Sequence, residues 1–189
     1  LFMFAVLFPG QGSQSVGMTK DLYEKYEIVK DIFNKADKTL GYSISSIILN
    51  GPISDLNQTE NTQPAIFVSS YSIFKLIKLK FGIDLNKAKY FAGHSLGEYT
   101  ALACSDAINF EDTISLLSKR GKAMQNAVPL GEGGMLAVLG KNTQEIEEII
   151  VKNNFNDCYI ANDNCPGQIV ISGKTVAITK LKNFLNDNL

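Results

Sequence analysis

The first eight residues form an uninterrupted apolar run, Leu-Phe-Met-Phe-Ala-Val-Leu-Phe, which ends at Pro9-Gly10. A run of this length that closes at a turn is typical of a strand buried in a parallel sheet. It is too short to cross a bilayer, and it lacks the basic segment that opens a secretory signal. The run therefore predicts a buried strand of an α/β protein.

Composition excludes several classes of protein. The 189 residues suffice for one or two domains, and 45% hydrophobic with 20% charged residues predicts a packed core rather than disorder. Eighteen basic and 19 acidic residues give a net charge of −1, so no electrostatic feature favours a nucleic acid or a membrane partner. One histidine, and three cysteines without a C-x-x-C pair, predict no metal site and no disulfide framework, which suits a reducing cytoplasm. The cysteines are Cys104, Cys158 and Cys165.

Apolar periodicity predicts helices and a second strand in residues 1–130. Pro64 is a good first helical residue, and the apolar residues that follow it fall on one face. That face consists of Ile66, Tyr71, Phe74, Ile77 and Phe81. The other expected elements are a helix over 23–36, a polar segment rich in turn residues over 41–52, a strand over 90–92, a helix over 98–107 and a helix from Asn109 to about Ala127.

Gly131, Gly133 and Gly134 mark a boundary, after which the pattern changes to β-α-β-β-α. We expect strands over 135–139, around Tyr159 and over 169–171, helices over 143–152 and 176–185, and a turn over 162–167. This order is that of a ferredoxin-like unit without its last strand. The sequence therefore predicts two domains, 1–130 and 131–189. Because unpaired strand edges are costly, we expect the natural polypeptide to continue and to supply the missing strand.

Gly93-His94-Ser95-Leu96-Gly97 matches the G-x-S-x-G nucleophile elbow, in which a serine occupies a sharp turn between a strand and a helix. In this context Ser95 is the candidate nucleophile, Gly93 and Gly97 allow close backbone packing, and the Leu96 N–H is a candidate oxyanion donor. His94 is interpreted as a support of the elbow rather than a general base, because adjacent residues on a tight turn point apart. Since it is the only histidine, the base lies outside this chain or is not a histidine.

Two further features could complete such a site. Phe8-Pro9-Gly10-Gln11-Gly12 places a glycine-rich loop at the carboxyl end of the first strand, where open α/β sheets bind ligands. If the loop lies beside the elbow, the Gln11 N–H becomes a second oxyanion donor. Arg120 is the only arginine among 18 basic residues, and a guanidinium binds a carboxylate bidentately. A structural or surface ion pair is an equally good interpretation of Arg120 from spacing alone.

The same glycine-rich loop leaves a nucleotide-binding hypothesis open. As a dinucleotide motif it has Ser15 where the third glycine belongs, and as a phosphate loop it has Met18 where a lysine belongs. A non-catalytic nucleotide-binding module over Gly10–Gly17 is therefore a weaker alternative.

Several segments together resemble one family. They are Phe-Pro-Gly-Gln-Gly-Ser-Gln at 8–14, Thr-Gln-Pro-Ala at 62–65, Gly-His-Ser-Leu-Gly-Glu-Tyr at 93–99, Arg-Gly at 120–121 and the stretch from Asn162 to Gly173. In this order they are similar to the malonyl-CoA:acyl carrier protein transacylases and to the acyltransferase domains of polyketide synthases. The resemblance extends over essentially the whole chain and corresponds to the N-terminal part of the family.

The resemblance implies an α/β-hydrolase-like core with an inserted ferredoxin-like subdomain. It implies that Ser95 takes a malonyl group from coenzyme A and passes it to the phosphopantetheine thiol of acyl carrier protein, in fatty acid biosynthesis. Gln11 and Leu96 would then form the oxyanion hole, and Arg120 would hold the malonyl carboxylate. The implied protein is a cytoplasmic monomer with no bound cofactor, whose partners are a coenzyme A thioester and, transiently, acyl carrier protein.

One departure from the family bears on activity. The family's catalytic histidine follows the final strand of the small subdomain, and this sequence ends before that position. We therefore expect little or no turnover from these 189 residues alone. A serine esterase that uses the same elbow remains an alternative, favoured if Arg120 points to solvent.

Overall fold

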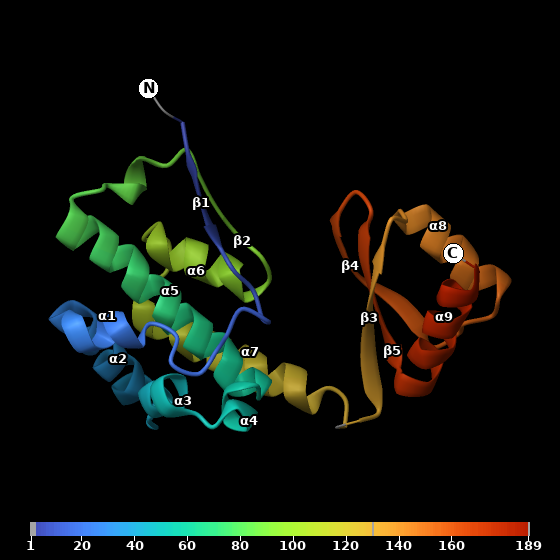
Figure 1. Cartoon of the computed structure of the whole chain (residues 1–189), viewed down its shortest axis with the longest axis horizontal. Coiled ribbons are helices and arrows are strands. Elements are labelled where there is room, and N and C mark those ends of the chain that lie inside the picture. The colour runs from blue at the N-terminus through green and yellow to red at the C-terminus, as the bar shows by residue number, and fades with distance from the viewer. Residues whose placement is uncertain (1–2, 130, 189) are drawn as a thin grey trace. The chain divides into compact units, whose positions relative to one another are not determined.

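The computed structural model describes residues 3–129 and 131–188 (Figure 1). The chain divides into two compact units, Leu1–Asn126 and Ala127–Leu189. In the described part of the chain, no helix is both long enough and apolar enough to span a membrane.

A two-stranded parallel sheet lies at one side of the first unit. Strand β1 (Ala5–Phe8) pairs with β2 (Tyr90–Gly93), and Phe8 lies opposite Gly93 (Figure 1). The predicted strand at 90–92 and the parallel type of the opening strand are confirmed. The prediction that the opening strand is buried on both faces is wrong, because Phe8 packs inward while Leu7 is 74% exposed. Phe8 stacks with Phe91 of β2 and contacts Phe74 of the helix over residues 59–81.

The chain between the two strands is mainly helical. The single helix predicted over 23–36 is two helices, α1 (Lys20–Lys25) and α2 (Glu27–Leu40), because Tyr26 adopts an extended conformation between them. The polar segment predicted over 41–52 contains helix α3 (Ile44–Asn50), so its prediction as irregular chain is wrong. Ile44 and Ile48 of α3 are fully buried in the core, which outweighs the local turn signals.

Helix α5 (Thr59–Phe81) forms the centre of the first unit and follows the short helix α4 (Ile53–Leu56). It begins five residues before the predicted start at Pro64, which lies inside the helix. Residues 61–69 are all buried, so this part of the helix is enclosed on every side. Ile66 and Phe74 are buried as predicted, but Phe81 is 61% exposed, and its assignment to the buried face is wrong.

The remaining elements of the first unit are a 3-10 turn at Leu85–Lys87, α6 (Leu96–Cys104) and α7 (Phe110–Asn126). The predicted start of α7 is confirmed: the Asp112 N–H donates to Asn109 Oδ1 at 2.8 Å. Phe67 of α5 packs against Phe110 of α7 with ring centroids 5.2 Å apart. The main core is thus formed between α2, α3, α5, α6 and α7.

The second unit has the predicted order β-α-β-β-α. Its elements are β3 (Gly133–Leu139), α8 (Thr143–Lys152), β4 (Cys158–Cys165), β5 (Gln168–Lys174) and α9 (Thr175–Asn188). The sheet order is β3-β5-β4, and both pairings are antiparallel. The turn predicted over 162–167 is too long, because Asn162 pairs with Val170 and Cys165 with Gln168. Two irregularities of register accommodate these polar residues in β4, and Pro166-Gly167 alone makes the turn.

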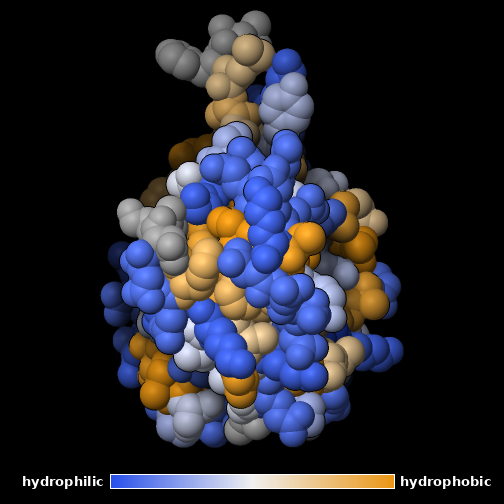
Figure 2. Space-filling model, turned by 90° about the vertical axis from the view of Figure 1, so that its right-hand side faces the viewer, coloured by the Kyte–Doolittle hydropathy of each residue, from blue (hydrophilic) through white to orange (hydrophobic). Residues whose placement is uncertain are grey.

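One face of this sheet packs on α8 and α9 through Ile146, Ile169, Ile171 and Leu181, all buried. On the opposite face Met135 of β3 is 64% exposed. Figure 2 shows one side of the molecule, on which hydrophilic residues are interspersed with smaller groups of hydrophobic ones.

Candidate active site

Strand β2 passes into α6 through Ser95, at the predicted elbow. Ser95 has φ 55° and ψ −111°, a backbone conformation that L-residues rarely adopt. A non-glycine residue held in such a region costs on the order of 1–3 kcal/mol. Interactions elsewhere in the fold must offset this cost. The strained conformation places the half-buried side chain of Ser95 at the N-terminus of α6.

Two glycines make this turn possible. A Cβ on Gly93 would overlap the carbonyl group of Gly97 and would lie 2.5 Å from the Glu98 nitrogen. A Cβ on Gly97 would collide with the Phe8 oxygen and would lie 2.8 Å from the Pro9 oxygen. Gly93 therefore lets the start of α6 fold back closely on β2, and Gly97 lets the end of β1 approach the elbow.

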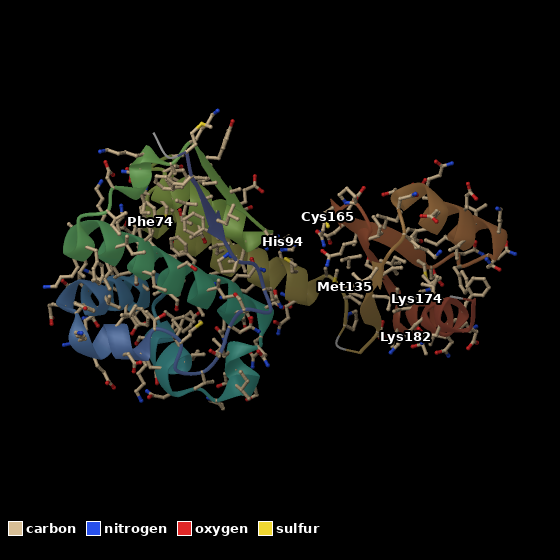
Figure 3. The ribbon with its side chains drawn as sticks, turned by 45° about the horizontal axis from the view of Figure 1, so that its top comes forward. Phe74, His94, Met135, Cys165, Lys174 and Lys182 are labelled. Carbon is tan, nitrogen blue, oxygen red and sulfur yellow. The ribbon has the colours of Figure 1, made fainter. Side chains whose placement is uncertain are left out.

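The loop after β1 lies beside the elbow. The His94 N–H donates to the Phe8 carbonyl at 3.2 Å, and the His94 carbonyl accepts from the Gly97 N–H at 2.9 Å. A Cβ on Gly10 would be only 2.7 Å from His94 Nδ1, so the imidazole packs directly on the loop. Figure 3 shows His94 at the end of β2, where its side chain is exposed.

Arg120 of α7 reaches the serine across the fold. Its Nη2 donates to Ser95 Oγ at 3.0 Å, and its Nη1 donates to Gln63 Oε1 at 2.6 Å. The guanidinium carbon lies 5.8 Å from the centre of the Tyr99 ring, which is within the range of a cation–π contact. Arg120 is half-buried, so these partners fix the direction of its terminal nitrogens.

Gln63 is a site residue that sequence reasoning did not single out. Its side chain is fully buried, and its Nε2 donates to the sulfur of Met124 at 3.3 Å. The segment Thr-Gln-Pro-Ala at 62–65 contributes to the family resemblance, but the sequence alone assigns no role to Gln63. Its position within a helix that is buried all round is the signal that could have revealed it, since a buried amide needs hydrogen-bond partners.

A third close approach brings α7 to α5. A Cβ on Gly121 would be 2.6 Å from both Glu60 Cα and the Thr59 oxygen. Gly121 therefore allows the neighbouring Arg120 to come within hydrogen-bond distance of Gln63.

The candidate oxyanion donors lie at the start of α6 and in the loop after β1. Leu96 is the first residue of α6, and the N–H groups of a first turn have no partner within their own helix. Gln11 lies in the loop after β1, and its Nε2 is 3.5 Å from Thr59 Oγ1 at the start of α5. The structure thus joins Ser95, Arg120 and Gln63 by direct hydrogen bonds, and it links Gln11 to the N-terminal end of α5.

Cys104, at the opposite end of α6 from Ser95, carries a thiol and is a second candidate nucleophile on this segment. Burial raises the pKa of its thiol to about 12, with Asp106 adding to the effect and Lys75 opposing it. A thiol that keeps its proton in this way is a poor nucleophile at neutral pH. Ser95 is therefore the better candidate on this helix.

Comparison with known proteins gives one consistent result. Residues 5–187 match the model of the acyl transferase domain family. The chain is 43% identical over 178 residues to a malonyl CoA-acyl carrier protein transacylase of Haemophilus influenzae, and 41% identical over 186 residues to that of Bacillus subtilis. These alignments cover 94% and 97% of this chain but only 56% and 57% of the relatives.

Solved structures agree with this result. An acyl-carrier-protein S-malonyltransferase from Bartonella henselae matches with a TM-score of 0.90 at 40% identity, over 98% of this chain and 60% of the other. A type II PKS acyl-carrier protein in complex with its malonyl-transacylase matches with a TM-score of 0.85 at 38% identity, over 94% of this chain and 57% of the other. The chain thus spans slightly more than half the length of the proteins it resembles, and it belongs to the acyl transferase domain family.

Proposed function

We propose that this chain carries the acyl-accepting half of a malonyl-CoA:acyl carrier protein transacylase, with Ser95 as the nucleophile and Arg120 as the group that binds the acyl carboxylate. The observation that carries this proposal is the 3.0 Å hydrogen bond between Arg120 Nη2 and Ser95 Oγ. It places a bidentate anion-binding group next to a hydroxyl on a strained turn. An acyl group with a free carboxylate, such as malonyl, could bind Arg120 through that carboxylate and react with Ser95 at its thioester carbon.

The proposed reaction has two balanced steps. Ser95 Oγ forms a bond to the thioester carbon of malonyl-CoA, the C–S bond breaks, and the serine proton ends on the sulfur of coenzyme A. The thiol of acyl carrier protein then attacks the malonyl-serine ester, which restores the serine hydroxyl and leaves malonyl on the carrier. In each step the developing oxyanion would be stabilised by the N–H groups of Leu96 and Gln11.

We assign Gly93, His94 and Gly97 to supporting the elbow rather than to chemistry. The backbone of His94 is tied to Phe8 and Gly97, and its ring packs on Gly10. These contacts favour a structural role. We therefore propose that none of these three residues acts as the general base. We also propose no cofactor.

The site also sets selectivity. Because only a carboxylated acyl group can make a charge-assisted, bidentate contact with the guanidinium of Arg120, acetyl-CoA should load less well than malonyl-CoA. For the architecture, we propose an α/β-hydrolase-like core followed by a ferredoxin-like subdomain. The β3-β5-β4 strand order supports the second assignment.

The two alternatives receive less support. A serine esterase has no use for Arg120, yet Arg120 points to Ser95 and Gln63 rather than to solvent. In the glycine-rich loop the Gly12 N–H donates to Gln14 Oε1 at 2.8 Å, and the Gly17 N–H donates to the Ile48 carbonyl at 2.8 Å. Phosphate loops need such N–H groups to face the ligand, so this loop does not fit a nucleotide well.

Transfer of labelled malonyl from coenzyme A to holo acyl carrier protein by the full-length protein tests this function. We expect malonyl-carrier to form faster than free malonate. If free acid forms faster than malonyl-carrier, the esterase hypothesis replaces the proposal.

A further inference from the structure

We infer that the Arg120–Ser95 hydrogen bond holds the nucleophile in a less reactive resting state, and that the carboxylate of the incoming acyl group releases it. This inference rests on the proposed function and adds a mechanism of selectivity to it. Substrate choice would then depend on activation of Ser95 as well as on binding.

The hydrogen bonds of Arg120 engage both terminal nitrogens of its guanidinium. Nη1 donates to Gln63 at 2.6 Å, and Nη2 donates to Ser95 Oγ at 3.0 Å. The guanidinium has five N–H donors, and a carboxylate that approaches from the side of Ser95 meets the Nη2 donor that Ser95 now occupies. Because a charged carboxylate is a stronger acceptor than a neutral hydroxyl, it should take the Nη2 donor away from Ser95.

The two partners of Arg120 differ in how easily they can be displaced. Gln63 is fully buried and is held from its other end by Met124. Ser95 is only half-buried, at the edge of the site. We therefore expect the carboxylate to compete with Ser95 and to leave the contact between Arg120 and Gln63 in place.

The consequence for the reaction follows from the chemistry of the attacking atom. A cationic donor on Oγ withdraws electron density from the lone pairs that must attack the thioester carbon. In a malonyl group the carboxylate is one methylene away from that carbon, so one bound substrate can occupy Arg120 and present its thioester to Ser95. An acetyl group has no such carboxylate and leaves the hydrogen bond to Ser95 intact.

Linkage gives a test that requires no turnover. If malonate and Ser95 compete for Arg120, removal of the serine acceptor must tighten the binding of malonate. We would titrate free malonate by calorimetry into the protein and into its Ser95→Ala and Ser95→Cys variants. Cysteine keeps the volume of the side chain but is a weak acceptor, so it separates lost competition from added space. Ser105→Ala, an exposed serine after the end of α6, is the matched control.

We expect malonate to bind roughly three- to tenfold more tightly to both Ser95 variants, the factor that corresponds to one net hydrogen bond, and with unchanged affinity to the control. Equal or weaker binding to Ser95→Ala and Ser95→Cys would overturn the inference, and so would tighter binding to Ser95→Ala alone. Arg120→Met distinguishes this failure from failure of the proposed function. If the Arg120→Met variant binds malonate as tightly as the parent protein does, the proposal that Arg120 binds the acyl carboxylate is itself wrong.

Discussion

Gln63 Oε1 accepts a 2.6 Å hydrogen bond from Arg120 Nη1, although 57 positions separate the two residues in the chain. Gln63 is fully buried in α5, whereas Arg120 on α7 is half-buried and also reaches Ser95. The rigid, enclosed glutamine therefore fixes one end of a guanidinium whose other end faces the reactive hydroxyl.

Gln63→Leu tests this positioning role. Leucine has a similar size but cannot accept, so the Nη1 donor of Arg120 loses its partner. We expect malonate affinity to fall by about 1–3 kcal/mol, while loading of acetyl, which needs no guanidinium, changes less. The measurement is malonate calorimetry together with malonyl and acetyl loading rates. Gln144→Leu, at an exposed position on α8, is the control, and an equal loss of both loading rates in Gln63→Leu would contradict the role.

Arg120→Ala tests recognition of the carboxylate directly. Loss of the guanidinium should shift the preference for malonyl over acetyl toward acetyl by about 1–3 kcal/mol. The ratio of kcat/KM values for malonyl-CoA and acetyl-CoA in the full-length protein measures this shift. Lys119→Ala, the exposed neighbour on α7, should leave the ratio unchanged. Equal losses for both substrates in Arg120→Ala would show that the residue supports the fold rather than selects the acyl group.

Gly93→Ala tests the geometry of the elbow. Its new Cβ would overlap the Gly97 carbonyl group, so we expect a loss of about 3 kcal/mol in the free energy of unfolding. Gly134→Ala is the matched control, since a Cβ there would meet Ile178 at an ordinary 3.6 Å and should change stability by no more than about 1 kcal/mol. Denaturant unfolding of both variants measures the difference. Similar values for the two variants would mean that the elbow relaxes more readily than its packing indicates.

The half-buried hydroxyl of Tyr42 should make the folded protein less stable at alkaline pH. Burial raises the pKa of its hydroxyl from 10.0 to about 12, with Glu60 and Asp37 adding to the effect, and the hydroxyl donates to Asn61 Oδ1 at 3.1 Å. At a pH between these two pKa values, Tyr42 is ionised in the unfolded chain but keeps its proton in the folded protein. The unfolded state then binds fewer protons, so the contribution of Tyr42 is complete below pH 10 and is lost as the pH rises toward 12.

Urea unfolding across this alkaline range measures the slope of stability against pH. We expect the parent protein to lose stability more steeply than Tyr42→Phe, which has no hydroxyl to ionise. Identical slopes in the two proteins would show that Tyr42 does not cause the alkaline loss.

Local sequence signals predicted those parts of the site that depend on the chain's immediate neighbourhood. Ser95 and its two glycines form one short segment, and the capping pair of Asn109 and Asp112 is separated by one turn of helix. Patterns of this kind carry their own stereochemistry. Arg120 stands out in the sequence as the single arginine, but spacing alone does not decide whether it binds a ligand or forms an ion pair.

The features that the sequence did not predict depend on tertiary packing. Helix α3 forms in a segment of turn residues because Ile44 and Ile48 find a core to enter. Strand β4 continues through Asn162 and Asp163 because β5 supplies partners for their backbone groups. In both cases long-range contacts outweigh local preference.

Ser95 is proposed to accept a malonyl group from coenzyme A. Brief exposure of the full-length protein to malonyl-CoA, followed by intact mass measurement and peptide mapping, tests this most directly. We expect one malonyl adduct on the peptide that contains Ser95, and none in the Ser95→Ala variant. No adduct on the parent protein, or an adduct that persists in Ser95→Ala, would contradict it.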